Sequence, residues 1–458
     1  MNGLILLISA AQVLDLSTPA LSSTSGHAGA PLAEWSVAPS QTATQELRYD
    51  DFIREVLDAN LDYAAAKYDV DVAKAQLAAA KLLPNPTLQL AGDRDLTFHN
   101  KYGTGSDGQP ALLRQVESRS IGITQTVELG GKRKWRIRTA DQTYRAASAT
   151  LDDFLRNLKI DASEAFADAL AAQRTVEQKK LAAGFLAELT HAQELRYSEG
   201  GISQTDLNQT RLEEFQFRDE LIKAEDEAEQ ARLALSTFLG RNRGQTDFIV
   251  SGQLEQTPRS YDLGPLITRA LSERPDLVAL RHTRDAAQSS IKLAQWKIVP
   301  DVDVGVTYTD NGGVVANHPI DPTPADHQLG LSLSFPLPMF DRGQHDVEIA
   351  RAQADQAQAQ LSAAELKAEV EIRTADSQYR SALKRVEQFK GDLLKSAAAV
   401  LEAKRYSYQR GGSTLLELLV AQRSANDVQQ SYEDALGEVA KALLELERST
   451  NIGDVSFQ

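Results

Sequence analysis

Residues 347–368, VEIARAQADQAQAQLSAAELKA, carry the pattern that decides the fold. Apolar residues recur there in alternating steps of three and four positions, which is the heptad spacing of a coiled-coil helix. The seam consists of Val347, Ala350, Ala354, Ala357, Leu361, Ala364 and Ala368. Between Gln344 and Gln409 only Gly391 interrupts the helical pattern, which at 1.5 Å per residue predicts a helix of about 100 Å. Because alanine lets helix backbones approach closely, the seam predicts a thin helical wall rather than a wide core.

The composition agrees with long helices and excludes several classes of protein. The chain has 458 residues, only 27 Gly and 15 Pro, and no Cys, so it has no disulfide framework, thiolate metal site or cysteine nucleophile. Its 49 Lys and Arg against 64 Asp and Glu give a net charge of −15, which argues against a nucleic-acid-binding protein. We find no nucleophile elbow, triad spacing or phosphate loop on a suitable scaffold, so we predict no enzyme and no cofactor.

The N-terminal residues 1–47 resemble an export signal followed by a flexible segment. The apolar run from Leu4 to Leu14 is too short to span a bilayer, which needs about 20 residues, but suits the core of a signal peptide. No Lys or Arg precedes this run, and cleavage after Ala10 or after Ala28 remains open. The alternative is an N-terminus that is merely disordered. No other segment resembles a transmembrane helix.

Two sequence markers indicate that the chain is an internal repeat. Lys81-Leu-Leu-Pro84 recurs as Lys297-Ile-Val-Pro300, an offset of 297 − 81 = 216. Tyr197 and Tyr408 each precede a Gly-Gly pair, and their offset is 408 − 197 = 211. Each half is expected to run helix, two strands and a long helical hairpin. The predicted divisions are a first repeat at 48–240, a linker at 241–262, a second repeat at 263–449 and a C-terminal tail at 450–458.

Four segments have the strict alternation of half-buried strands. Their apolar positions are Leu88 and Leu90; Ile121, Ile123, Val127 and Leu129; Val302, Val304, Val306 and Tyr308; and Leu329, Leu331, Leu333, Phe335 and Leu337. Each run is about ten residues long, which is the length of a transmembrane strand. We expect polar loops at 97–117 and 311–326 between the paired strands.

Four such strands cannot form a closed barrel by themselves. In lipid every backbone donor and acceptor must be paired, and the smallest outer-membrane barrels have about eight strands. The chain must therefore oligomerise or keep its strands out of lipid. Three copies would supply twelve strands, and the same threefold axis would arrange the thin helical walls into a tube.

The chain resembles the TolC-like outer-membrane efflux family over residues 48–450, and within it the CzcC-like heavy-metal branch. The strings that carry the branch resemblance are Pro84-Asn-Pro-Thr-Leu88, Glu128-Leu-Gly-Gly-Lys-Arg133 and Phe335-Pro-Leu-Pro-Met-Phe-Asp-Arg342. The resemblance implies a mainly α fold with a small β part. It also implies a homotrimer with a twelve-stranded barrel in the bacterial outer membrane and an α-helical barrel across the periplasm. Its implied partners are a periplasmic adaptor (membrane fusion protein), an inner-membrane RND pump and outer-membrane lipid.

On this basis we predict a passive exit duct of a tripartite efflux system for heavy-metal cations. The branch is associated with cobalt, zinc, cadmium, nickel, copper or silver. One alternative is the same duct serving drugs, other organic compounds or type I secretion. Another is a soluble periplasmic coiled-coil scaffold, although a scaffold would need no lipid-facing strands.

The hairpin tips are the leading candidates for function. Gly200 and Gly411 are expected to end helices, with Ser203 and Thr414 capping the next ones and with Asp206 and Glu417 in their first turns. The alternative is ordinary capping. By resemblance, the tips form the periplasmic gate, whose candidate residues are Tyr408, Asp206, Glu417, Tyr197, Arg405, Gly200 and Gly411.

A second candidate is a basic cluster where a strand leads into a helix. Its members are Lys132, Arg133, Lys134, Arg136 and Arg138. Because basic charge opposes the dipole at a helix N-terminus, something should compensate it, for example lipid phosphate or an acidic neighbouring chain at the inner membrane edge. The alternative is a solvated turn.

Metal-binding signals are weak. His318 and His327 share a loop with Asp321 and Asp326, but no pattern of a designed metal site occurs, so we expect none. Gly103 to Gly108 matches GxGxxG without the helix that a nucleotide site needs, and is expected to be a loop tip. Three chains would carry 3 × −15 = −45 charges, which would favour cations in a lumen.

Overall fold

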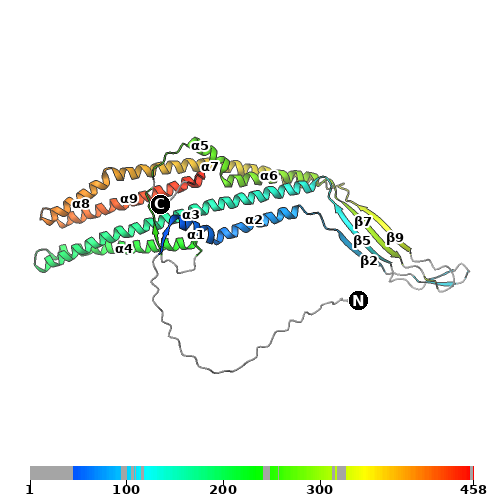
Figure 1. Ribbon diagram of the computed structural model, residues 1–458, viewed down its shortest axis with the longest axis horizontal. Helices are drawn as coiled ribbons and strands as arrows, with labels where there is room; N and C mark the ends of the chain where they lie inside the picture. The colour runs from blue at the N-terminus through cyan, green and yellow to red at the C-terminus, as the bar shows by residue number, and fades with distance from the viewer. Residues whose placement is uncertain are drawn as a thin grey trace, which may run out of the picture. The chain divides into compact units, whose positions relative to one another are not determined.

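Long helices make up most of the chain, and a four-stranded sheet continues from their ends (Figure 1). The computed structural model describes residues 45–93, 101–104, 108, 110–114, 118–240, 248–255, 257–311, 315–316, 326–453 and 457. Their helices are α1 (Tyr49–Ala59), α2 (Leu61–Ala80), α3 (Lys132–Ser198), α4 (Gln204–Phe238), α5 (Leu263–Glu273), α6 (Pro275–Trp296), α7 (Gln344–Gln388), α8 (Leu394–Gln409) and α9 (Leu415–Thr450). The mainly helical fold with a small β part is thus confirmed.

The helices pack side by side as the alanine seam predicts. Helix α6 contacts both α3 and α7, while α2 packs against α3, and α9 contacts both α7 and α3. Seam residues Ala350, Ala354, Ala357 and Leu361 are buried, which confirms that small side chains form the helix contacts.

The long helix predicted from Gln344 to Gln409 is interrupted where glycine was expected to weaken it. Helix α7 ends at Gln388, the π-helix η1 spans Phe389–Leu393 around Gly391, and α8 continues to Gln409. A π-bulge is a local insertion into an α-helix and is frequent at functional sites.

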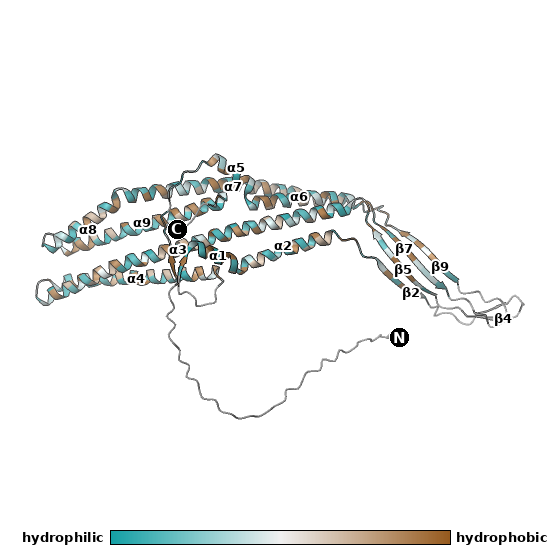
Figure 2. Ribbon diagram, viewed as in Figure 1, coloured by the Kyte–Doolittle hydropathy of each residue, from teal (hydrophilic) through white to brown (hydrophobic). Residues whose placement is uncertain are grey.

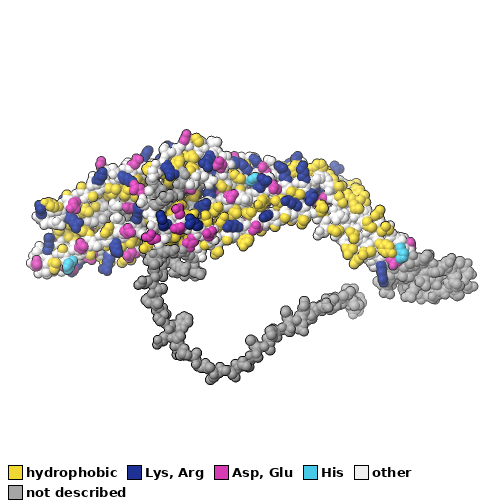
Figure 3. Space-filling view, in the orientation of Figure 1, with side chains coloured by type: hydrophobic (Ala, Val, Ile, Leu, Met, Phe, Trp, Pro, Cys, Tyr) yellow, Lys and Arg dark blue, Asp and Glu magenta, His cyan; other side chains and the backbone are white. Residues whose placement is uncertain are grey.

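The four predicted strands form one antiparallel sheet, although Leu129, Phe335 and Leu337 lie beyond the strand ends. Its strands are β2 (Thr87–Asp93), β5 (Ser118–Val127), β7 (Val302–Asn311) and β9 (Asp326–Ser334), in the order β2-β5-β7-β9. The central pair joins the two halves of the chain, with Ser118 opposite Asn311 and Val127 opposite Val302. Hydrophobic side chains gather over the strands, and charged ones are spread over the helices (Figure 3). Along the helices themselves, hydrophilic and hydrophobic residues are mixed (Figure 2).

Two groups of short strands were not predicted. The expected loops 97–117 and 311–326 contain β3 (Lys101–Thr104), β4 (Pro110–Arg114) and β8 (Val315–Ala316), which pair in the order β3-β4-β8. Gly103 lies in β3 opposite Ala111, so this end of the expected loop tip is a strand. Residues 105–107, His318 and Asp321 lie outside the described residues.

The second unexpected pairing is parallel and joins β1 (Gln45–Arg48) to β6 (Phe248–Ser251). Strand β6 lies in the predicted linker, and β1 includes residues 45–47, which were expected to belong to the flexible N-terminal segment. Beside this pairing lies the main hydrophobic core, where Tyr49 contacts Phe166 and Phe457 with ring centroids 5.5 and 5.1 Å apart. Phe457 is 1% exposed, so the described end of the predicted C-terminal tail packs into this core.

Among the described residues, none of the helices combines the length and the apolar character needed to cross a membrane.

Candidate functional site

Both hairpin tips are built from glycine in the left-handed region, as predicted. Gly200 and Gly411 each have φ +76°, a conformation that side chains with a Cβ rarely adopt. The next residue closes each helix, because Gly201 N donates to Arg196 O at 2.7 Å and Gly412 N donates to Ser407 O at 2.8 Å. These bonds satisfy carbonyls that a helix end leaves unpaired.

The acidic residues after the glycines occupy different surroundings in the two tips. Asp206 pairs with its own cap, since Ser203 Oγ accepts from Asp206 N at 3.1 Å and donates to Asp206 Oδ2 at 2.8 Å. Glu417 N is capped by Thr414 Oγ1 at 3.3 Å, but its carboxylate accepts from Lys404 Nζ of α8 at 2.8 Å. This bond and the charge of Lys404 lower the pKa of Glu417. Asp206 therefore stabilises its own turn, whereas Glu417 joins α9 to α8.

Tyr408 connects the two hairpins. Its hydroxyl accepts from Gln193 Nε2 and, at 3.3 Å, from Arg196 Nη1, and both donors lie on α3. The Arg196 guanidinium also lies 5.6 Å from the centre of the Tyr408 ring. Gln193 is only 1% exposed, and its Oε1 has no hydrogen-bond partner. Tyr197, the counterpart in the first tip, is 41% exposed.

Two arginines add contacts between the hairpins. Arg405 of α8 lies 4.9 Å from the centre of the Phe185 ring on α3, a cation–π contact. Arg423 of α9 donates to Gln216 Oε1 of α4 at 2.9 Å and lies 3.6 Å from Glu213. Together with Tyr408, they hold the hairpin α8–α9 against the hairpin α3–α4.

Sequence reasoning missed Gln193, Lys404 and Arg423 as parts of this network. For Gln193 a signal was present, because it lies seven residues after the fully buried Leu186 and so shares its heptad position. A buried polar residue at an apolar seam position needs a hydrogen-bond partner, and for Gln193 this partner is the hydroxyl of Tyr408.

Three members of the basic cluster have partners within the chain. Lys132 Nζ lies 2.6 Å from Asp301 Oδ1. Arg136 binds Glu128 with two hydrogen bonds, and Arg133 Nη2 donates to Lys81 O at 2.6 Å. For these three residues the compensation comes from within the chain, through two carboxylates and carbonyls at the C-terminal end of α2, rather than from lipid phosphate or a neighbouring chain.

The remaining members of the cluster are exposed. Lys134 lies 5.8 Å from the centre of the Trp135 ring, and the Arg138 side chain is exposed on the same helix. These two charges, rather than the whole cluster, are available to a ligand outside the chain.

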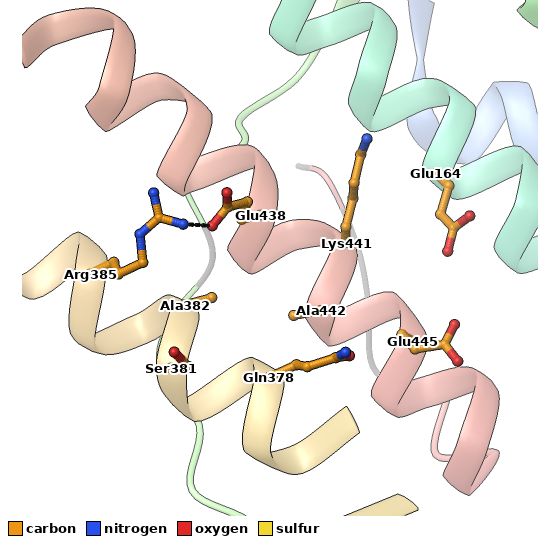
Figure 4. A pocket seen from close by; sticks show the side chains of 9 residues that line it. All are labelled: Glu164, Gln378, Ser381, Ala382, Arg385, Glu438, Lys441, Ala442 and Glu445. Carbon is orange, nitrogen blue, oxygen red and sulfur yellow. Dashed lines mark hydrogen bonds and ion pairs between the residues drawn. The ribbon is translucent and has the colours of Figure 1, made fainter. Parts of the chain in front are cut away.

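A charged pocket of about 420 Å³ lies beside the hydrophobic core (Figure 4). Its residues come from α3, α7 and α9, and its charges are paired: Arg385 binds Glu438, and Lys441 Nζ lies 2.6 Å from Asp168 Oδ1. Burial raises the pKa of Glu445, and the nearby Glu164 adds to this effect. In the described part of the chain no group of three or more His, Asp or Glu residues is arranged to hold a metal ion.

The chain matches the family described as "Outer membrane efflux protein" over residues 52–241 and 266–451. It is 25% identical to the cobalt-zinc-cadmium resistance protein CzcC of Cupriavidus metallidurans over 391 residues, which is 85% of this chain and 86% of that protein. It is 28% identical to the nickel and cobalt resistance protein CnrC of the same species, over 69% of both chains.

The fold is also similar to that of a solved structure, the CmeC outer membrane channel of Campylobacter jejuni. The TM-score is 0.71 at 15% identity, covering 93% of this chain and 94% of that one.

Proposed function

Since the chain belongs to the outer membrane efflux protein family, we propose that it is the passive exit duct of a tripartite, RND-type efflux system. The observation that carries the proposal is a four-stranded sheet, with two free edges, that continues directly into long helical hairpins. In this proposal the strands lie in the bacterial outer membrane and the hairpins extend into the periplasm. An adaptor and an inner-membrane pump would supply the energy, so the chain itself needs no catalytic residues.

A trimer would provide hydrogen-bond partners for the backbone groups at the free edges of the sheet. Every residue of the edge strands β2 and β9 is exposed, and each edge presents unpaired backbone groups. In lipid such edges must be paired, and pairing β9 with β2 of a neighbouring copy closes three chains into a barrel of twelve strands. The helices next to these edges also expose apolar side chains, with Tyr68 and Val72 on α2 and Leu366 and Val370 on α7.

The chain contains an internal template for the contact between copies. Within the chain the α3 N-terminus packs against the end of α6, where Asp301 Oδ1 accepts from Lys132 Nζ at 2.6 Å and from Leu129 N at 3.2 Å. The turns before α3 and α7 correspond, because Gly131 and Gly343 both have φ +72°.

The repeat then predicts which residues meet between copies. An offset of 343 − 131 = 212 places Gln344 at the position of Lys132. The offset of 216 between the segments that follow α2 and α6 places Asn85 at the position of Asp301, because 301 − 216 = 85. We therefore propose that Gln344 of one copy hydrogen-bonds Asn85 of the next, and that the two halves arose as a duplication with the boundaries 48–240 and 263–449.

Cross-linking tests this closure directly, because the chain has no native cysteine. Outer membranes carrying Asn85→Cys with Gln344→Cys are treated with a short bismaleimide and run on denaturing gels. We expect bands of dimer and trimer for the double variant and monomer for each single variant. A chain that leaves the membrane in carbonate as a soluble monomer or dimer would instead support the scaffold alternative.

The tip contacts support a gate at the periplasmic end. The bonds of Tyr408 and Arg405 to α3, and of Glu417 to Lys404, hold α8 in place, while the Asp206 cap and the glycine turns fix the tip geometry. We propose that the contacts of Tyr408 and Arg405 with α3 hold the tips closed and break when the tips separate, whereas the Glu417–Lys404 pair keeps α8 in the position that these contacts need.

The exposed part of the basic cluster supports a position at the membrane edge. Trp135 and the 42% exposed Trp296 lie near the junction of strands and helices, and tryptophan is enriched at membrane interfaces. Lys134 and Arg138 at the same junction are suited to bind lipid phosphate.

The relatives CzcC and CnrC support heavy-metal cations as the cargo. A duct should not bind its cargo tightly, and the acidic composition would attract cations without a specific site. Deleting the gene in its host should increase sensitivity to zinc, cobalt, cadmium or nickel, and a plasmid copy should restore resistance. Sensitivity that rises only for dyes and drugs would favour the organic-cargo alternative.

A further inference from the structure

The π-bulge in the second repeat has no counterpart in the first. Helix α3 runs from Lys132 to Ser198 without a break. The tip offset of 211 places Lys180, inside this unbroken helix, at the position of Gly391, because 391 − 211 = 180. Two hairpins with the same tips therefore differ in one local feature, which a duplication alone does not explain.

Packing changes at the same place. The buried residues of α7 extend to Val386, the last one before the bulge, whereas α8 beyond it has none. Segments with few buried contacts are those that open or move at the lowest free energy. On the tip side of the bulge, α8 is thus held mainly by polar and cation–π contacts, whereas α9 also buries Leu419 against Leu186 and Phe217.

Both helices of the hairpin carry a glycine close to the bulge. Arg385 of α7 pairs with Glu438, and the rings of Phe389 and Tyr432 lie 6.3 Å apart, so the bulge begins opposite Tyr432 and Gly437 lies beside the last turn of α7 before it. Gly391 in the bulge and Gly437 in α9 each have open space where a Cβ would stand, so packing does not require glycine at either position. Glycine inside a helix lowers its stability relative to alanine, which makes bending easier there.

An ion pair links the bulge to an anchored part of the chain. Lys390 Nζ binds Glu255 Oε1, and Glu255 follows Leu254, which is fully buried in the main core. The Lys390 and Glu255 side chains are 45% and 54% exposed, so solvent can replace this contact readily.

We infer that Phe389–Leu393 is a pivot about which α8 and the tip end of α9 swing when the duct opens, and that Lys390 and Glu255 form a latch that favours the closed position. A π-bulge serves as a pivot because its hydrogen-bond ladder is already irregular and can change without breaking a regular α-helix. The unbroken α3 would then be the fixed wall. This inference rests on the proposed duct and its gate.

Channel recordings of purified protein in planar bilayers test the latch. Lys390→Met and Glu255→Gln should each raise the ratio of open to closed states by about 1.4- to fivefold, the range for an exposed ion pair. Arg373→Met is the matched control, because it removes an exposed pair with Glu369, at 2.7 Å, on α7 before the bulge. This control should have the same ratio of open to closed states as wild type.

Cross-linking then tests whether motion at this place is needed for opening. In the variant Lys390→Cys with Glu255→Cys, a cleavable bismaleimide should abolish opening, and cleavage of the linker should restore it. Each single variant treated with the reagent serves as the control.

A deletion tests the pivot itself. Removing Gly391 takes out the extra residue of the bulge and keeps the faces of α7 and α8 in register, so the variant should form trimers yet open several-fold less often. If wild type forms conducting trimers but the deletion, the latch variants and the cross-link leave opening unchanged, the pivot is refuted and the duct stands. If wild type forms neither trimers nor channels, the duct itself is refuted.

Discussion

Replacing Tyr408 by Phe removes one hydroxyl and leaves the ring in place. The hydroxyl accepts from Gln193 and Arg196 of α3, so the substitution cuts the polar link between the hairpins. The cation–π contact of Arg196 needs only the ring and should persist. We expect the tips of Tyr408→Phe to open more readily than those of wild type.

The magnitude follows from the burial of Gln193. This side chain is 1% exposed and its Oε1 already lacks a partner, so the substitution leaves its amide without any hydrogen bond. An unpaired buried polar group costs about 1–3 kcal/mol. If the bond exists only when the tips are closed, the ratio of open to closed states rises by about 5- to 150-fold.

Single-channel recording in planar bilayers measures this ratio, and the chain offers two matched controls. Tyr406→Phe makes the same change two residues away on α8, at a side chain that is 53% exposed. Tyr197→Phe makes it at the corresponding position of the first tip, which is also exposed. Both controls should stay within about twofold of wild type, since exposed substitutions have small effects. Equal open fractions for Tyr408→Phe and Tyr406→Phe would refute the reasoning.

Three further predictions concern stability and pH. Arg136→Met leaves the 11% exposed Glu128 without its partner and should lower the unfolding free energy by about 1–3 kcal/mol in thermal melts, whereas the exposed Arg138→Met should change it little. The lowered pKa of Glu417 means that its contribution to closure is complete above the ordinary value of 4.5 and is lost as the pH falls through the lowered value. Acid should therefore raise the open fraction of wild type, and Glu417→Gln should flatten this dependence. Phe457→Ala leaves a cavity where a buried ring was and should lower the unfolding free energy by about 3–5 kcal/mol in the same melts. An unchanged melting curve would contradict the packing described for the tail.

Features set by short stretches of sequence could be predicted. Glycine ends a helix, and Ser203 or Thr414 begins the next one, through contacts within a few residues, so both tips were predicted correctly. The four strands of the sheet were predicted for the same reason, because alternation is a local pattern.

Features that depend on distant partners could not be predicted in the same way. The four-residue strands β1 and β6 pair across about two hundred residues of chain, and neither is long enough to show a pattern. The basic cluster was identified by composition, but only the structure shows that Lys132 and Arg136 are neutralised by Asp301 and Glu128. The candidate gate residues Tyr408 and Glu417 were carried over by resemblance, and their partners on α3 and α8 emerged only from the packing.

The pairing of β5 with β7 also has a consequence for the order of folding. Residues 118–127 meet residues 302–311, so all of α3, α4, α5 and α6 must be synthesised before this pair can form. Contacts between distant residues form slowly because a long loop must close first, whereas the hairpin α3–α4 needs only local contacts. We therefore expect the helical hairpins to fold first and the sheet to form last, so that the strands reach the membrane unpaired and join there.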